Sequence, residues 1–208
     1  MKWTGKKLDE IENVLVSIGP GSFTGVRIAI SVVKGLFFGR NVNFYEVNEL
    51  DALGFQGYYN LKVNLENDED VKIYSLIDSR KEKIYCAAYE TFNGKAGRKL
   101  ELVKNYEVTK LDNVIEEIIE NKQDKGNNKK IYLIGDAVFN YKAKILDKLG
   151  YFVKIFEDKN LAINTMTYVE MFLDENLRND NVIKKTDIFN LKPDYLEKSQ
   201  AERDKKQC

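Results

Sequence analysis

The segment most able to do chemistry is a glycine-rich loop over residues 19–27, with the sequence Gly-Pro-Gly-Ser-Phe-Thr-Gly-Val-Arg. A loop of this kind between a strand and a helix is the context of a phosphate cradle. The residues do not fit a Walker A loop. That motif needs glycine, lysine and Ser/Thr at three successive positions, where this chain has Thr24, Gly25 and Val26. The glycines are also spaced GxGxxxG, not GxGxxG. We therefore predict a structural loop, a tight turn with a close backbone approach, made by Gly19, Pro20, Gly21, Ser22 and Thr24.

Other catalytic arrangements are restricted because the chain contains no histidine. Histidine is the usual general base near neutral pH and the commonest metal ligand, so Ser-His-Asp systems, Cys-His systems and HExxH zinc sites are excluded. Carboxylate or lysine chemistry stays possible, and Asp78 and Asp136 are the nearest candidates for it. A turn cap is the simpler interpretation of Asp78, and the start of a loop is the simpler interpretation of Asp136. We predict no catalytic residue, no metal site and no bound cofactor.

Composition narrows the possible partners and compartment. Lysine plus arginine equals aspartate plus glutamate, at 33 each. A strong sequence-independent grip on nucleic acid needs an excess of cations, so direct high-affinity binding of RNA by the whole surface is not expected. Two cysteines, Cys86 and Cys208, form no disulfide framework, and no run approaches the ~20 apolar residues that cross a bilayer. We expect a cytoplasmic protein with no membrane contact.

The elements around the loop alternate in the manner of α/β proteins. A β-branched run at 14–18 predicts a buried strand, and a helix follows from Ser22 or Thr24 to about residue 38. Further strands are expected at 41–47, 71–78, 84–90, 99–108, 131–134 and 151–156, and further helices at 48–59, 109–119, 139–149 and 165–178. The polar stretch 60–70 marks a boundary. We expect an N-terminal half at 1–70, a C-terminal half at 71–200 and a mobile tail at 201–208.

The helix after the loop has an apolar arc of about half its circumference, wider than the ~100° that one buried face needs. One stripe holds Val26, Ile30, Val33 and Phe37, and a second holds Ala29, Val32 and Leu36, with Ile28 beside it. Either the helix is buried on all sides in its own chain, or one stripe meets a partner. A partner interface would be drawn from Gly25, Val26, Arg27, Ala29, Ile30, Val33, Lys34 and Phe37. Because a cation in the first turn opposes the helix dipole, Arg27 is expected to have an acidic neighbour.

The run from Gly19 to Ala29 resembles the signature of the TsaB family, also called YeaZ. Later segments match that family in order: Lys34-Gly-Leu, Glu49-Leu-Asp-Ala-Leu, Leu76-Ile-Asp-Ser-Arg-Lys, Ile84-Tyr and Pro193-Asp-Tyr-Leu. The similarity covers residues 8–198. It implies an actin-like, Hsp70-like ATPase fold with two related α/β halves of ribonuclease-H type. Family members begin with a strand, a β-meander and a helix before the matched region, so the first half is expected to be incomplete and the chain truncated at its N-terminus.

The resemblance also implies a function. TsaB proteins are non-catalytic subunits that pair with the catalytic paralogue TsaD and the ATPase TsaE. Together these proteins place threonylcarbamoyl on adenosine in tRNAs that read ANN codons. The family's equivalent helix joins a helical bundle with TsaD or with a second TsaB copy, which implies a heterodimer or homodimer here. ATP would be used by the partner subunits, and tRNA would be bound only through the complex.

Two other classes stay open on the residues alone. The first is an enzyme of the same superfold, either a small-molecule kinase or a peptidase-like protein, with Asp78 and Asp136 as its carboxylates. The second is an interaction module for an unrelated partner. Co-purification from the native host separates them, because only the TsaB interpretation predicts capture of TsaD.

Overall fold

The computed structural model describes residues 5–62, 70–80, 82–94, 97–123, 129–156, 162–180 and 182–196. The chain forms two compact units. The first contains residues 1–49 and 168–208, and the second contains residues 50–167. The predicted tail at 201–208 lies outside the described residues, as do positions 63–69 of the predicted boundary loop.

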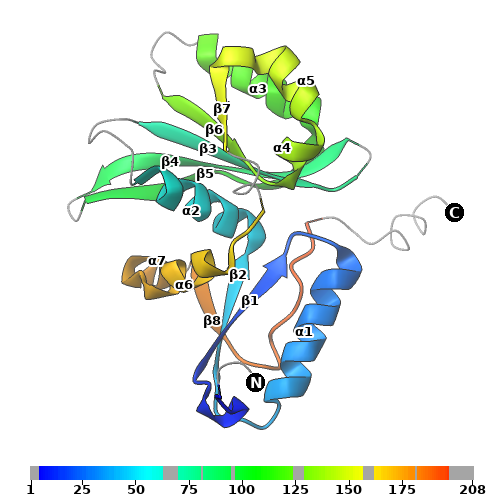
Figure 1. The fold of residues 1–208 in the computed structure, drawn as a ribbon, viewed down its shortest axis with the longest axis vertical. Coiled ribbons are helices and arrows are strands. Elements are labelled where there is room, and N and C mark those ends of the chain that lie inside the picture. The colour runs from blue at the N-terminus through cyan, green and yellow to red at the C-terminus, as the bar shows by residue number, and fades with distance from the viewer. Residues whose placement is uncertain are drawn as a thin grey trace, which may run out of the picture. The chain divides into compact units, whose positions relative to one another are not determined.

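The first unit is built on a sheet that has three strands within the described residues, in the order β1-β2-β8. Strand β1 (Asn13–Gly19) pairs parallel with β2 (Asn43–Asn48), and helix α1 (Phe23–Phe37) connects them (Figure 1). This parallel pairing confirms the strand–helix–strand organisation expected from the sequence. Strand β8 (Ile183–Thr186) adds to β2 in antiparallel fashion. A short 3-10 helix, η1 (Leu8–Glu10), precedes β1.

The second unit has a sheet of five described strands in the order β5-β4-β3-β6-β7. Its strands are β3 (Val71–Asp78), β4 (Lys83–Gly94), β5 (Gly97–Lys110), β6 (Lys130–Ile134) and β7 (Val153–Ile155). The first three form an antiparallel meander, and β6 and β7 run parallel to β3. Helices α3 (Leu111–Gln123) and α5 (Lys142–Leu149) lie on one face, and α2 (Glu49–Lys62) lies on the other (Figure 1).

Several predicted elements end differently in the structure. The single helix expected at 139–149 is two helices, α4 (Asp136–Asn140) and α5, that meet at Tyr141. The helix expected at 165–178 is divided into α6 (Thr165–Leu173) and α7 (Glu175–Asn179). The division falls at Asp174, whose carboxylate accepts a hydrogen bond from the backbone N–H of Asn176 and begins a new helix.

The two units also divide the chain differently from the expected segments 1–70 and 71–200. Helix α2 belongs to the second unit from Leu50 onward. The chain returns to the first unit at Tyr168, and β8 then joins the first sheet. Within the described part of the chain, no helix is both long and apolar enough to cross a membrane.

Candidate protein-interaction surface

The glycine loop packs against Asp194, near the end of the described part of the chain. Gly19 ends β1 with φ +108°, and a Cβ there would lie 3.2 Å from the backbone oxygen of Asp194. The N–H of Asp194 donates a 2.8 Å hydrogen bond to the carbonyl of Ile18. The peptide bond between Gly19 and Pro20 is cis. The close backbone approach is therefore at Gly19, where only glycine fits both the conformation and the space.

The start of α1 is held by a helix cap. The Ser22 hydroxyl accepts a 3.3 Å hydrogen bond from the N–H of Gly25, which satisfies one of the free donors of the first turn. Gly25 itself is exposed, and an added Cβ would meet only the side chain of Ser22, at 3.4 Å. In contrast to Gly19, no described neighbouring backbone approaches Gly25. Its lack of a side chain leaves open space on the helix surface.

One of the two apolar stripes of α1 faces inward. Ile30 is 4% exposed and Phe37 is 5% exposed, and both pack with Val16, Phe44 and Leu191 in the core of the first unit. Val26 and Val33 are partly buried against the same core. These four residues were assigned to a partner interface from the sequence. The structure places Ile30 and Phe37 in the core and Val26 and Val33 against it, because the sheet needs one apolar stripe of α1 to cover it. The open side of the helix is therefore formed by other residues.

The other stripe faces outward. Ile28 is 58% exposed, Val32 is 53% exposed and Leu36 is 45% exposed. The outward face of α1, as the term is used below, consists of Gly25, Ile28, Ala29, Val32, Gly35 and Leu36. It carries no charge and no polar side chain. Contiguous exposed apolar surface of this kind marks interaction sites more often than bare protein surface, so this face is the candidate functional site.

The chain's last described segment runs along one flank of α1. This C-terminal segment, residues 187–196, is anchored by Leu191, which is fully buried. At the carboxyl end of the helix, the rings of Phe38 and Phe189 meet edge to face at 6.2 Å, and Lys34 Nζ donates a 3.3 Å hydrogen bond to the Phe189 carbonyl. Hydrogen bonds from Asn190, helped by the charge of Lys34, lower the pKa of Asp187.

At the amino end of α1, an arginine is clamped by two aromatic rings. The Arg27 guanidinium lies 3.8 Å from the centroid of Phe23 and 5.4 Å from that of Tyr195. Its Nε donates a hydrogen bond to the Tyr195 hydroxyl, and the two rings stack at 4.9 Å. The acidic neighbour expected for Arg27 is not among the described residues. Aromatic faces and a neutral hydroxyl hold this cation instead.

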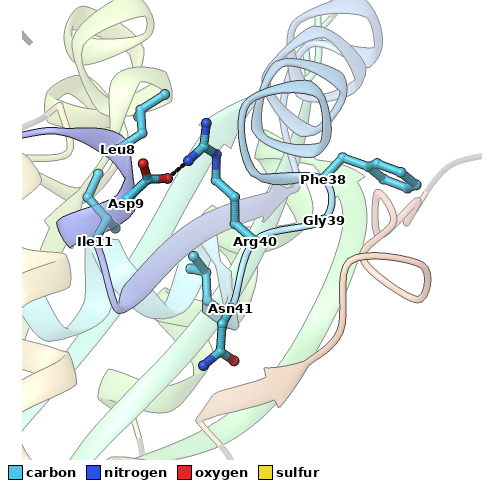
Figure 2. A pocket seen from close by; sticks show the side chains of 8 residues that line it. Leu8, Asp9, Ile11, Phe38, Gly39, Arg40 and Asn41 are labelled. Atoms are coloured by element: carbon cyan, nitrogen blue, oxygen red, sulfur yellow. Dashed lines mark ion pairs between the residues drawn. The ribbon is translucent and has the colours of Figure 1, made fainter.

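A hollow of about 450 Å³ adjoins the carboxyl end of α1 (Figure 2). Its lining is Leu8, Asp9, Ile11, Phe38, Gly39, Arg40, Asn41 and Val42. The Arg40 guanidinium forms an ion pair with Asp9, and its Nε donates a 3.1 Å hydrogen bond to the Leu36 carbonyl. The Arg40 guanidinium is thus already paired with Asp9 and with the Leu36 carbonyl. We interpret the hollow as an extension of the surface beside α1 and not as a reaction site.

The two candidate carboxylates meet at the carboxyl ends of β3 and β6. Asp136 accepts a 2.8 Å hydrogen bond from the N–H of Asp78, and Asp78 accepts from the N–H of Arg80 and from the Asn140 amide, at 2.8 and 2.9 Å. Burial, opposed by the hydrogen bond from the Asp78 backbone, raises the pKa of Asp136. Asp78 thus caps the turn after β3, and Asp136, the first residue of α4, ties that helix to the end of β3. Among the residues that the structure describes, no group of three or more Cys, Asp or Glu could hold a metal ion.

A buried carboxylate that sequence reasoning missed lies in α2. Asp51 accepts hydrogen bonds from the hydroxyls of Tyr89 and Tyr106, each at 2.8 Å. Burial raises the pKa of Asp51 to about 6, and the two hydrogen bonds oppose that rise. No local signal identifies this site, because its partners stand 38 and 55 residues away in the chain.

Comparison with known proteins shows which family this chain resembles. Residues 1–204 match the family model described as TsaD, tRNA N6-adenosine threonylcarbamoyltransferase. The chain is 27% identical over 144 residues to the tRNA threonylcarbamoyladenosine biosynthesis protein TsaB of Buchnera aphidicola, covering 68% of this chain and 58% of that protein. It is 31% identical over 87 residues to the TsaB protein of Escherichia coli, covering 42% and 35%. The Bacillus subtilis TsaB protein is 28% identical over 85 residues, covering 41% and 33%. The matched region thus spans between a third and three fifths of these relatives.

Two solved structures from Pseudomonas aeruginosa have a similar fold. One is YeaZ, with a TM-score of 0.65 and 19% identity. The other is an uncharacterised protein described as similar to peptidase YeaZ, with a TM-score of 0.62 and 18% identity. Each comparison covers 94% of this chain and 78% of the other. The predicted actin-like, ribonuclease-H-like α/β fold is confirmed.

Proposed function

The chain belongs to the TsaB (YeaZ) family of tRNA threonylcarbamoyladenosine biosynthesis, and we propose that it is a non-catalytic subunit that binds and supports a TsaD-type catalytic subunit. The product of the assembly is threonylcarbamoyladenosine in tRNAs that read ANN codons. A TsaE-type ATPase completes the assembly. The subunit works in the cytoplasm, and tRNA reaches it only through the complex.

The observation that carries this proposal is the outward face of α1. Its exposed aliphatic side chains, Ile28, Val32 and Leu36, are interrupted by Gly25, Ala29 and Gly35. Small residues allow two helix backbones to approach closely, and the aliphatic side chains beside them then fill the grooves. The helix is about 22 Å long, which is enough for a helix–helix contact of several turns. A helix of the catalytic subunit is the occupant that family membership suggests, and a second copy of this chain is the alternative.

The non-catalytic role is supported by how the chain uses its polar groups. The whole sequence lacks histidine. Asp78 and Asp136 are the carboxylates on which a kinase or peptidase of this superfold would depend. Their oxygens accept hydrogen bonds from backbone N–H groups, at the end of β3 for Asp136 and in the turn after β3 for Asp78. In this proposal ATP binds to the partner subunits and the chain itself needs no cofactor.

Reconstitution tests the proposal. TsaD-type and TsaE-type subunits from the same organism are mixed with ATP, threonylcarbamoyl-adenylate as the donor and an ANN-decoding tRNA, with and without this chain, and modified nucleoside is measured by mass spectrometry. We expect modification only when the chain is present. The chain alone should neither hydrolyse ATP nor cleave peptides.

An Asp78→Ala variant separates support from catalysis. It should still support modification if it folds, which circular dichroism checks. Turnover by the purified chain that disappears in Asp78→Ala would favour the enzyme alternative. Full modification without the chain would refute the supporting role.

A further inference from the structure

The chain passes between the two units twice, and neither passage is a loop. The first unit ends at Glu49, and the chain returns to it at Tyr168. Glu49 is the first residue of α2 and directly follows Asn48, the last residue of β2. Tyr168 is the fourth residue of α6, so the return passage lies inside a helix. Both passages are therefore made of regular secondary structure.

In the first unit, one carboxylate ties the two passages together. The Tyr168 hydroxyl donates a 3.0 Å hydrogen bond to Glu49 Oε2, and the hydroxyl of Ser17 in β1 donates to the same oxygen. Burial, followed by the charge of Glu49, raises the pKa of Tyr168, so its hydroxyl stays protonated and remains a donor. Hydrogen bonds to an ionised carboxylate are stronger than those between neutral groups. The residue before one passage and the residue after the other are thus held at the same point of β1.

In the second unit, Gln56 of α2 has the corresponding role. Its side-chain amide donates a 2.9 Å hydrogen bond to the Ala162 carbonyl. Its oxygen accepts from the Asn164 N–H at 2.6 Å and from the Thr167 hydroxyl at 3.1 Å. Gln56 follows Glu49 by seven residues, about two turns, so both lie on one side of α2. The residues that lead into the return passage are therefore held to the helix that begins at the outward passage.

We propose that Glu49 and Gln56 join the two passages into one double connector, a hinge on which the two units turn about a common axis, with the Glu49–Tyr168 hydrogen bond as its pin. Hinges absorb their rotation at a few residues at the ends of helices and strands, which is where Glu49 and the first turn of α6 lie. Two connectors that are held to each other bend together and resist twisting. This device is independent of the proposed function, because it needs no partner.

The test uses the full chain with one spin label in each unit and double electron–electron resonance as the readout. Lys184→Cys in β8 and Glu120→Cys in α3 place the labels at exposed positions. Cys208→Ser removes the terminal thiol, and Cys86 is buried and stays unlabelled. We expect one narrow distribution of distances between the labels in the wild-type background, because both passages are held.

Tyr168→Phe removes the donor of the pin and keeps the ring. It should broaden the distance distribution and make amide hydrogen exchange in residues 165–173 roughly tenfold faster, because a hydrogen bond to a charged group is lost. Glu49→Ala removes the acceptor and should have the same two effects. Tyr45→Phe is the matched control, since Tyr45 is also a partly buried tyrosine of the first unit and its ring lies 5.0 Å from that of Phe172 in α6. It should change neither quantity.

Several results would each overturn the inference. A broad distribution in the wild-type background would show that the passages are loose connectors. A wild-type distribution in both Tyr168→Phe and Glu49→Ala would show that this hydrogen bond does not pin the hinge. Faster exchange without a broader distribution would limit the bond to a local role in α6. Loss of cooperative melting in both variants would assign the bond to the core of the first unit, because a pin leaves the packing of each unit intact.

Discussion

Helices α1 and α3 are of similar length, 15 and 13 residues, and each buries one apolar stripe on its own sheet. They differ on the opposite side. The exposed positions of α3 include Asp112, Asn113, Glu116 and Glu120. The corresponding side of α1 is aliphatic, with Ile28, Val32 and Leu36 in the open. A helix whose outer side faces solvent carries polar residues on that side, as α3 does. The aliphatic outer side of α1 therefore indicates a contact with a partner that α3 does not need.

Helix α2 shows the other explanation of a wide apolar arc. Leu50 to Tyr58 are all buried, and Gln56 is satisfied by the Ala162 carbonyl, the Asn164 N–H and the Thr167 hydroxyl. A helix buried on all sides in its own chain was the alternative interpretation of α1. The comparison with α2 excludes it within the described residues, since α1 keeps half its circumference exposed.

The largest expected effect concerns the inward stripe. Ile30→Glu should prevent folding of the first unit, because an unpaired carboxylate in the core costs several kcal/mol. Circular dichroism should show loss of the cooperative melting transition. Ile118→Glu in α3 is the matched substitution at a buried position and should be equally damaging to the second unit. Wild-type melting of Ile30→Glu would show that the inward stripe is misassigned.

A smaller effect is expected at Gly25. Gly25→Leu should leave the melting temperature of the isolated chain close to wild type, because the added side chain meets only Ser22. Overpacking in the helix contact should weaken partner binding by about 1–3 kcal/mol. Asn113→Leu, at an exposed position of α3, is the control and should bind normally. If Gly25→Leu binds the TsaD-type subunit as well as Asn113→Leu does, no helix approaches closely at this point.

The smallest predicted effect tests burial in α2. The folded-state pKa of Asp51, about 6, exceeds its usual value of 3.8. The stability that this carboxyl contributes is therefore present below pH ~4 and is lost as pH rises through 6. Between pH 5 and 7, the free energy of unfolding should fall by about 1 kcal/mol from this group. Asp51→Asn should lose that slope in urea titrations, and an unchanged slope would show that Asp51 is not the group that titrates.

Much of this organisation could be predicted from residue patterns. The i, i+3, i+4, i+7 pattern from Leu111 to Ile118 predicted α3, and the run before Gly19 predicted β1, because each element's side chains pack locally in a regular period. The width of the apolar arc identified α1 as unusual. The pattern could not show which stripe faces the sheet, since both stripes are aliphatic and only the position of β1 decides between them.

The C-terminal contributions to the site could not be predicted. Strand β8 has four residues, two of them lysines, and pairs with β2 across more than half of the chain. Tyr195 reaches Arg27 over 168 positions, and Phe189 reaches Lys34 over 155. Contacts at such separation leave no periodic signal. The sequence predicted an acidic partner for Arg27, but within the described residues two aromatic rings and the Tyr195 hydroxyl hold this cation.

The most direct test of the account is sedimentation velocity of the chain with the TsaD-type subunit, for wild type and for Val32→Glu. Glu116→Lys, which changes charge on the outer side of α3, is the control. Circular dichroism melting accompanies each variant. Val32→Glu should melt like wild type, because Val32 is exposed, yet sediment apart from the partner, because its carboxylate would be buried unpaired in the contact. A folded Val32→Glu that still forms the complex would contradict the claim that the outward face of α1 is the interface.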